Sequence, residues 1–354
     1  MSKLIMLGLG LTGWNSLSLE GVDLVKSADK VYLEIYTSPV STNLKKELEK
    51  ITGKQVKVVS REFIEDGREI INESKQKKVV VLSSGDPMAA TTHMDLRVRA
   101  AKEGVETRVI HNASIMTAIF GETGLHAYNF GKTVTMVKSG LTLQTTVTNT
   151  IFENLLRRLH TLILLEYDSV SGFFLDPSDA IKSLLATEKE LKQNLFHKDT
   201  FLIIASRIGG QDQSITCGQI SSLDRKEFGK PPHVLIIPGR LHFTEIDALK
   251  TLTESLEVDI LDNSEKVVRL AETMVRKYVK KSWSALEKAR TSSHLNEKMD
   301  YTTLFENIEC YISDAERFLN QGRDELAILS IGYAEGLLDS LRLLSIDNFS
   351  EIWE

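Results

Sequence analysis

The chain has 354 residues, of which 42% are hydrophobic and 26% charged, and its formal net charge is −6. This length allows two or three domains, and the negative charge argues against broad non-specific binding to nucleic acid. The two cysteines, Cys217 and Cys310, lie far apart, which fits a reducing compartment and offers neither a zinc site nor a disulfide framework. No apolar run reaches the roughly 18–20 residues that span a bilayer, and the N-terminus lacks a cleavage signature, so we expect a cytoplasmic protein with no membrane partner.

Residues 1–112 alternate between strand and helix patterns. Short apolar runs rich in Val, Ile and Leu predict strands at 3–9, 31–36, 56–59, 79–83 and 107–110. Amphipathic stretches between them predict helices, such as "LKKELEKITG" with Gly53 as its C-cap and "HMDLRVRAAKEG" ending at Gly104. This alternation predicts an α/β domain with a parallel or mostly parallel sheet covered by helices.

Residues 113–262 predict a second α/β domain. Ser114 is placed to N-cap the helix "IMTAIFGETG", and "TVTNTIFENLLRR" and "DPSDAIKSLLATEKEL" predict two more helices, the latter with Pro177 at its start. Strands are predicted in "KTVTMVKSG", "HTLILLEYD", "DTFLIIASRIGG" and "PPHVLIIPG".

Residues 263–354 predict a separate all-α domain. "NSEKVVRLAETMVRKYVKKSWSALEKA" has apolar residues at helical spacing and no Gly or Pro, and a polar break at 290–300 follows it. Two further amphipathic helices form a predicted hairpin around Asn320–Arg323. The stripe Ile308, Ile312, Ala315 and Leu319 is interpreted as core. The basic run "VRKYVKK" at 275–281 is interpreted as a solvated helix face.

Three glycines follow the first predicted strand. Gly8, Gly10 and Gly13 spell G-x-G-x-x-G, and Glu34 lies 21 residues beyond Gly13, as in a dinucleotide-binding fingerprint. That fingerprint needs a helix that opens within the glycines, whereas the helical pattern here starts only near Ser18. A nicotinamide enzyme and a purely structural glycine turn remain alternatives to a ligand that is approached by backbone at several strand ends.

The stretch "VVVLSSGDPMAATTH" (79–93) leaves a buried strand through Gly85-Asp86-Pro87, at the edge where open α/β sheets bind ligands. Together with "LIMLGLGL", "ADKVYLEIYTS", "VIHNASIMTA", "GLHAYNFGKTVT" and "PPHVLIIPGRLH", this motif resembles the diphthine synthase family of the tetrapyrrole-methylase-like class. The resemblance covers roughly residues 3 to 245. The C-terminal segment resembles an archaeal helical domain of unknown function, and its presence departs from the usual single-module enzyme.

The resemblance implies an α/β fold of two tetrapyrrole-methylase-type domains with a cleft for S-adenosyl-L-methionine between them. The implied cofactor-binding residues are Leu11, Asp86, Ala89, Ser114, Ile115, Leu165, Ile208 and His233. Asp86 and Ala89 would contact the amino-acid and ribose parts, and Leu165, Ile208 and His233 would close over the adenine. Methyl transfer needs close alignment of two reactants rather than a strong acid, so no catalytic residue and no metal is assigned.

The implied reaction is methylation, with trimethylation favoured, of the amino group of 3-amino-3-carboxypropyl-histidine on translation elongation factor 2, which gives diphthine. The family is usually a homodimer. Nucleic acid is not expected as a partner, except through the C-terminal domain. The alternatives are a precorrin-type tetrapyrrole methyltransferase of the same fold class and a non-catalytic, translation-associated binding module.

Two other groups of residues are weighed against a functional role. His93, Asp95 and His111 match no common zinc spacing, so a solvated or helix-capping role is expected for them. Glu34 and Tyr36, at a strand end beside Thr37, are candidates to face the substrate. His233, Asp86 and Ser114 each also have a structural interpretation, as a partly buried histidine, a turn cap and a helix N-cap.

Overall fold

The computed structural model describes residues 3–39, 43–138, 143–224, 226–256, 260, 262–291 and 300–344. Contacts within the chain divide it into two compact units, Met1–Val267 and Val268–Glu354. Within the described residues, no helix has the length and apolar character that a membrane span requires. The end of the expected strand at 132–140 and most of the polar break at 290–300 lie outside the described residues.

The first sheet of unit 1 has five strands, all parallel, in the order β3-β2-β4-β1-β5. Its strands are β1 (Lys3–Gly8), β2 (Lys30–Glu34), β3 (Val56–Val59), β4 (Lys78–Ser83) and β5 (Thr107–Ile110). Parallel sheets are covered on both faces, so their strands are nearly continuous apolar runs. The four residues Val79 to Leu82 of the central strand β4 are at most 2% exposed. The five predicted strands and their parallel arrangement are confirmed.

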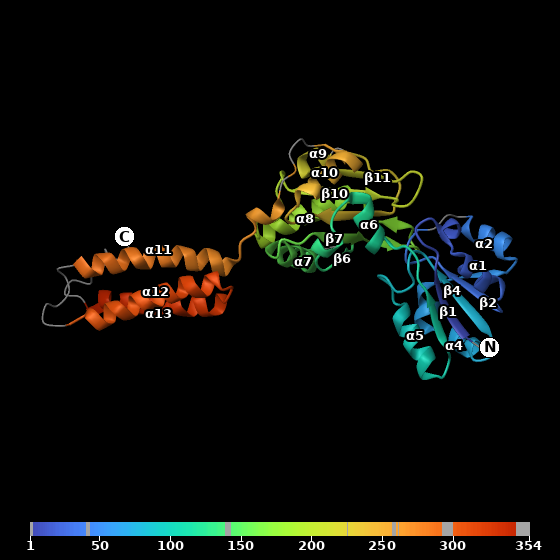
Figure 1. Ribbon diagram of the computed structural model, residues 1–354, viewed down its shortest axis with the longest axis horizontal. Coiled ribbons are helices and arrows are strands. Elements are labelled where there is room, and N and C mark those ends of the chain that lie inside the picture. The colour runs from blue at the N-terminus through green and yellow to red at the C-terminus, as the bar shows by residue number, and fades with distance from the viewer. Residues whose placement is uncertain are drawn as a thin grey trace. The chain divides into compact units, whose positions relative to one another are not determined.

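Helices cover both faces of this sheet (Figure 1). One face packs against α1 (Leu19–Lys26) and α2 (Leu44–Thr52), and the other against α3 (Arg61–Asp66), α4 (Arg68–Ser74) and α5 (His93–Lys102). Gly53 ends α2 in the left-handed conformation at φ 68°, as predicted. The loop after β1 forms a 3-10 turn, η1 (Gly13–Ser16), and the first α-helix begins only after its N-cap Ser18.

The second sheet of unit 1 has six strands in the order β13-β11-β10-β12-β7-β6. Its strands are β6 (Val134–Met136), β7 (Thr161–Leu165), β10 (Phe201–Ser206), β11 (Ser214–Gln219), β12 (His233–Ile237) and β13 (Glu254–Ser255). Strand β10 is antiparallel to β11 and β12, and β12 is antiparallel to β7. The sequence patterns did not predict β11 or β13.

Two helical layers also enclose this second sheet. Helices α7 (Thr145–Leu156), α8 (Pro177–Leu191) and α9 (Ile220–Leu223) pack on one face, and α6 (Ile115–Thr123) and α10 (Phe243–Leu252) on the other. Ser114 caps α6, because its Oγ accepts a hydrogen bond from the Met116 amide at 3.2 Å. A short turn η2 (Ala127–Asn129) precedes β6, and a two-stranded ribbon, β8 (Tyr167–Asp168) with β9 (Phe173–Phe174), follows β7.

The helix expected from residue 263 begins later, at Leu270. Residues Asn263–Lys266 form a 3-10 turn, η3, that is capped by Asp262. The buried Asn263 side chain donates to the carbonyls of Phe201 and Pro238, and Val267 packs into the core of the second sheet. These contacts hold residues 263–267 in unit 1. The division of unit 1 at residues 112 and 113 stays a prediction.

Unit 2 consists, in its described part, of α11 (Leu270–Thr291), α12 (Thr302–Asn320) and α13 (Asp324–Leu344). All three helices contribute to one apolar core. Ile308, Ile312 and Ala315 are fully buried and Leu319 is partly buried, which confirms that this stripe is core. Helices α12 and α13 pack against each other across the predicted turn.

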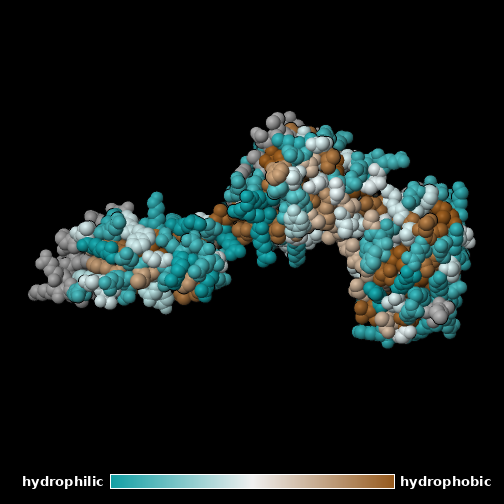
Figure 2. Space-filling model, viewed as in Figure 1, coloured by the Kyte–Doolittle hydropathy of each residue, from teal (hydrophilic) through white to brown (hydrophobic). Residues whose placement is uncertain are grey.

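The basic run at 275–281 lies on α11. Val275 and Val279 are buried in the core, while Arg276, Lys277, Lys280 and Lys281 are exposed. Hydrophilic residues predominate on the face of this unit that is visible in Figure 2. The interpretation of this run as a solvated helix face is therefore confirmed.

Candidate active site

A cavity of about 610 Å³ in unit 1 is lined by residues from both sheets. The first sheet contributes the loops that follow β1, β2, β4 and β5, all at its carboxyl edge. The second sheet contributes the ends of β6, β7 and β10 and the start of the antiparallel β12. This volume lies within the usual range of small-molecule sites, about 300–1,000 Å³. All eight residues that the resemblance implied for cofactor binding line this one cavity.

The glycines of the first sheet join two strand ends at the cavity. Gly10 and Gly85, both with positive φ, exchange backbone hydrogen bonds of 3.0 and 2.9 Å. A Cβ on Gly10 would lie 2.6 Å from the Ser16 Cβ, and one on Gly8 would lie 2.5 Å from the Gly85 carbonyl oxygen. The glycines therefore allow a close backbone crossing, and no α-helix opens within them as a dinucleotide fingerprint requires.

Asp86 organises the loop that follows β4. Its Oδ1 accepts the Met88 amide at 2.8 Å, and its Oδ2 accepts the Asn112 amide at 3.1 Å and bonds to His111 Nδ1 at 2.8 Å. The side chain is only 12% exposed. Oδ1 thus shapes the β4 loop itself, and Oδ2 holds that loop to the β5 loop. Of residues 86–89, Asp86 and Ala89 line the cavity.

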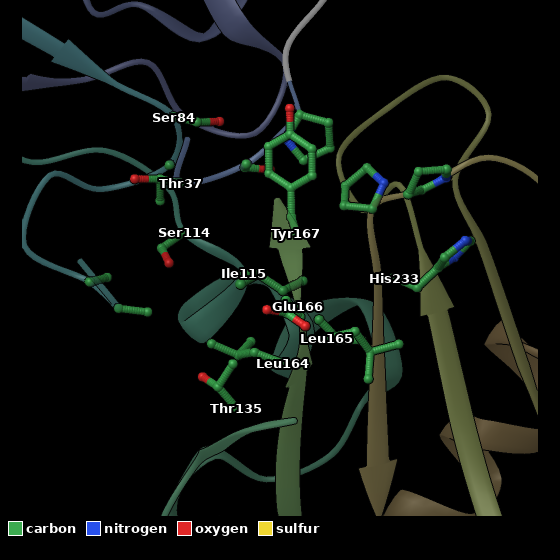
Figure 3. A pocket seen from close by; sticks show the side chains of 18 of the residues that line it. Thr37, Ser84, Ser114, Ile115, Thr135, Leu164, Leu165, Glu166, Tyr167 and His233 are labelled. Atoms are coloured by element: carbon green, nitrogen blue, oxygen red, sulfur yellow. The ribbon is translucent and has the colours of Figure 1, made fainter. Parts of the chain in front are cut away.

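Ser114 and Ile115 stand where the loop after β5 becomes helix α6. The Ser114 hydroxyl is used as the helix cap, as its structural interpretation required. Ile115 is the first helical residue, so its N–H has no partner within the helix. Figure 3 shows both side chains among the residues that line the cavity. A helix start of this kind offers hydrogen-bond donors to a polar ligand.

The second sheet presents side chains instead. Leu164 and Leu165 from β7 and Ile208 after β10 form an apolar wall, and His233 lies at the start of β12 (Figure 3). Nδ1 of His233 shares a 2.7 Å hydrogen bond with Ser206 Oγ. Burial lowers the pKa of His233, so its imidazole is neutral at pH 7. This wall suits the flat face of a heterocycle.

Several lining residues escaped the sequence patterns. Tyr36 and Thr37 line the cavity as expected for substrate-facing residues, but Glu34 does not; it is fully buried and its Oε2 accepts the amides of both residues at 2.9 and 3.0 Å. The sequence did not single out four further lining residues, Arg61, Glu166, Tyr167 and Phe174. The last two lie in two-residue strands, which are too short for any periodic signal.

The three residues weighed as metal ligands have separate partners. His93 is 1% exposed and bonds to the Pro87 carbonyl at 3.1 Å and to the Tyr36 hydroxyl at 3.3 Å, so the expected solvated or capping role is wrong for it. Asp95 pairs with Arg99 at 2.7 Å, and His111 bonds to Asp86. Within the part of the chain that the structure describes, no cluster of three such side chains is placed to hold a metal ion.

Comparison with known proteins places this fold and cavity in a family. The sequence model of the Tetrapyrrole (Corrin/Porphyrin) Methylases matches residues 3–224, and a model described as Protein of unknown function (DUF357) matches residues 277–346. The chain is 39% identical to the diphthine synthase of Methanocaldococcus jannaschii, over 72% of this chain and 100% of the relative. It is 38% identical to that of Methanosarcina mazei, over 74% and 100%.

A solved structure agrees with these relatives. The crystal structure of a diphthine synthase matches with a TM-score of 0.64 and 34% identity, over 72% of this chain and 97% of that one. The chain therefore belongs to the tetrapyrrole methylases and, among them, to the diphthine synthase family. It is an S-adenosylmethionine-dependent methyltransferase with an additional C-terminal helical unit.

Proposed function

We propose that this chain methylates the amino group of 3-amino-3-carboxypropyl-histidine on translation elongation factor 2, with trimethylation to diphthine, in diphthamide biosynthesis. The observation that carries the proposal is its 39% identity to a diphthine synthase over that relative's whole length. The cavity supports it, because all eight residues implied for the cofactor line one space between two sheet edges.

The cavity fits S-adenosylmethionine by the chemistry of its walls. The loops after β1, β4 and β5 offer backbone groups to the polar amino-acid and ribose parts, and Leu165, Ile208 and His233 offer a mostly apolar surface to the adenine. When bound, S-adenosylmethionine would supply a methyl group on a sulfonium; as its C–S bond breaks, the neutral amine nitrogen would form the new N–C bond, and the resulting ammonium would lose its proton to solvent. The residues of the chain hold and align the two reactants, which supplies several kcal/mol of the barrier.

The cavity has an apolar wall of Leu164, Leu165 and Ile208. The carboxyl side chains that line it are Asp86 and Glu166, and the Glu166 Oε2 accepts the Lys138 amide at 2.5 Å. We place the reaction in the cytoplasm, with the enzyme as a homodimer.

The direct test is to incubate the full chain with radiolabelled S-adenosylmethionine and archaeal elongation factor 2 that carries the aminocarboxypropyl-histidine intermediate. We expect label on the factor, with mass spectrometry showing three added methyl groups on the intermediate. Factor with unmodified histidine is the control and stays unlabelled. No label from a folded enzyme that binds the cofactor would contradict the proposed substrate.

We propose that unit 2 assists docking to the elongation factor or to ribosomal RNA. Its exposed cations Lys277, Lys280 and Lys281 support this, since exposed positive charge steers association with acidic partners. A chain that ends at Val267 should methylate the factor more slowly, and its rate should depend less on salt. An unchanged rate with unchanged salt dependence would remove a docking role.

A further inference from the structure

More residues line the cavity than the eight that are assigned to the cofactor. Among the lining residues outside that set are three aromatic side chains, Tyr36, Tyr167 and Phe174. They come from different parts of unit 1, since Tyr36 follows β2 of the first sheet and the other two form the ribbon β8–β9. The three rings therefore line one space that a reactant can enter.

The ribbon fixes two of the rings. Tyr167 and Phe174 are directly paired across it, and their rings stack with centroids 5.0 Å apart and planes 18° apart. Figure 3 shows the Tyr167 ring extending from the end of β7 among the residues that line the cavity. The stack sets the plane of the Tyr167 ring and leaves it half-buried.

The ring of Tyr36 is positioned by contacts with Thr92 and His93. The Tyr36 hydroxyl lies 3.3 Å from His93 Nε2 and 3.4 Å from Thr92 Oγ1, and its ring meets the His93 ring edge-on at 6.1 Å. Glu34 is fully buried, and its Oε2 accepts a hydrogen bond from the Tyr36 amide. Its other oxygen, Oε1, is buried and has no hydrogen-bond partner among the described residues.

The negative charge of Glu34 affects the pKa of both tyrosines. Burial raises the pKa of Tyr36 to about 12 and also raises that of Tyr167, and the Glu34 carboxylate adds to the increase in each case. The buried Glu34 carboxylate is hydrogen-bonded to the Tyr36 amide, and its charge also acts on Tyr167 in the ribbon β8–β9. The two arginines that line the cavity are each paired with an acid, Arg61 with Glu65 at 2.7 Å and Arg207 with Asp212 at 2.8 Å, which offsets their charge.

Aromatic faces that surround a space, with a carboxylate behind them, bind quaternary ammonium groups through cation–π attraction. We propose that Tyr36, Tyr167 and Phe174 form a subsite for the methylated ammonium group of the substrate, with Glu34 as the buried counter-charge. This inference rests on the proposed function, because it takes the methyl acceptor to be an amine. Such a subsite keeps the mono- and dimethylated intermediates in place, and it accounts for repeated transfer at one nitrogen.

The first experiment uses choline as the probe and its neutral isostere 3,3-dimethyl-1-butanol as the matched compound. Both are titrated into the full chain saturated with S-adenosylhomocysteine, and binding is followed by calorimetry. We expect choline to bind on the order of tenfold more tightly than the isostere. Equal affinities would overturn the subsite, and this comparison needs no variant to fold.

Variants test whether the aromatic rings cause the tighter binding of choline. Tyr167→Leu should weaken choline binding on the order of tenfold, whereas Tyr167→Phe, which keeps the ring, should stay within about twofold. Tyr128→Leu is the matched control, since Tyr128 is 79% exposed and lies outside the cavity lining. If Tyr167→Leu, shown to be folded by its thermal transition, bound choline like the wild type, the assignment would be wrong.

The sulfonium of the cofactor is the other cation that the rings could hold. In Tyr167→Leu, the ratio of S-adenosylmethionine to S-adenosylhomocysteine affinity should equal that of the wild type. A selective loss of S-adenosylmethionine affinity would place the sulfonium at the rings and overturn the proposal. The substrate question stays separate: choline selectivity without label on the elongation factor contradicts only the proposed function, and label without choline selectivity contradicts only the subsite.

Discussion

The two sheets of unit 1 contribute to the cavity in different ways. The all-parallel first sheet brings several carboxyl ends to one edge, and it presents backbone turns that are held by the Gly10–Gly85 pair and by Asp86. The mixed second sheet presents side chains such as Leu165 and His233. Its strands are braced from behind by buried polar residues, Asn263 and the Glu245–His160 pair.

This difference indicates how each wall tolerates change. A wall made of backbone depends on conformation, so it should be sensitive to glycine replacement and indifferent to the size of small side chains. A wall made of side chains should respond to truncation of those side chains and to the loss of the polar residues that brace the strands. Four measurements separate these two expectations.

The largest effect on stability is expected when the chain is truncated before Asn263. A chain ending at Asp262 loses Asn263, whose side chain makes hydrogen bonds to Phe201 N, Phe201 O and Pro238 O at 3.0, 2.8 and 3.0 Å, and it loses the buried Val267. Three such bonds and one apolar side chain contribute about 4 kcal/mol to stability. Urea unfolding of chains 1–262 and 1–267 measures this difference, and equal stability would show that Asn263 does not brace the second sheet.

The next effect depends on pH. Glu245 is fully buried; burial alone would raise its pKa, but hydrogen bonds from His160 and from the amides of His126 and His242 outweigh this and lower the pKa to about 2. A depressed carboxyl pKa gives stability that is present above the unfolded value of about 4.5 and is lost as the pH falls towards 2. The shift corresponds to about 3 kcal/mol.

Glu245→Gln should therefore be less stable than the wild type at pH 7, and this difference should shrink as the pH falls below about 4.5. Unfolding free energies at pH 7, 4 and 3 test this expectation. Glu47→Gln, a change at a partly exposed side chain on helix α2, is the control and should follow the wild type. A constant difference at all three pH values would exclude ionised Glu245 as the source.

Glycine replacement tests the backbone wall that the first sheet contributes to the cavity. Gly10→Ala and Gly53→Ala both place a side chain at φ near +67°, but a Cβ on Gly10 meets Ser16 at 2.6 Å and one on Gly53 meets nothing within 4 Å. The left-handed conformation alone costs about 1 kcal/mol, and the crowding at Gly10 adds about 1–3 kcal/mol. Denaturant unfolding gives both values. Equal losses would mean that Gly10 is not tightly packed against Ser16.

The smallest effect compares side chains across the cavity. Leu165→Ala should weaken S-adenosylhomocysteine binding by about tenfold, because it removes apolar surface from the second wall. Ala89→Gly should change this affinity by less than about fourfold, because Ala89 is expected to contribute backbone and a single methyl group is worth about 0.8 kcal/mol at most. Calorimetric titration measures both variants, and the reverse order of losses would contradict the division into a backbone wall and a side-chain wall.

Much of the fold could be predicted from local patterns. The five strands of the first sheet are long apolar runs bounded by turns, and helix ends at Gly53 and Ser114 follow from the ordinary preferences of cap residues. Strand β11, "SITCGQ", was missed because Thr, Cys and Gly weaken its apolar signal, although four of its six residues are buried. The start of α11 was placed seven residues early, because the buried contacts of Asn263 are tertiary and leave no periodic pattern.

The residues of the candidate site could likewise be predicted only in part. Resemblance over several separated motifs pointed to eight residues that prove to line one cavity, although no local pattern brings Leu11, Leu165 and His233 together. Tyr167 and Phe174 could not be found this way, since they belong to a ribbon of two-residue strands. His93 bonds to Pro87 in the loop that leads into α5 and to Tyr36 in the loop after β2. The contact with Tyr36 is tertiary, so the burial of His93 could not be inferred from its exposed-looking neighbours.

A crystal structure of the full chain grown with S-adenosylhomocysteine would decide whether both sheets build one cofactor site. The account predicts the ligand in the cavity, in contact with the backbone of residues 86–89 on one side and with Leu165, Ile208 and His233 on the other. It also predicts that the rings of Tyr36, Tyr167 and Phe174 remain free of the cofactor. A ligand bound outside this cavity, or held by one sheet alone, would contradict the account.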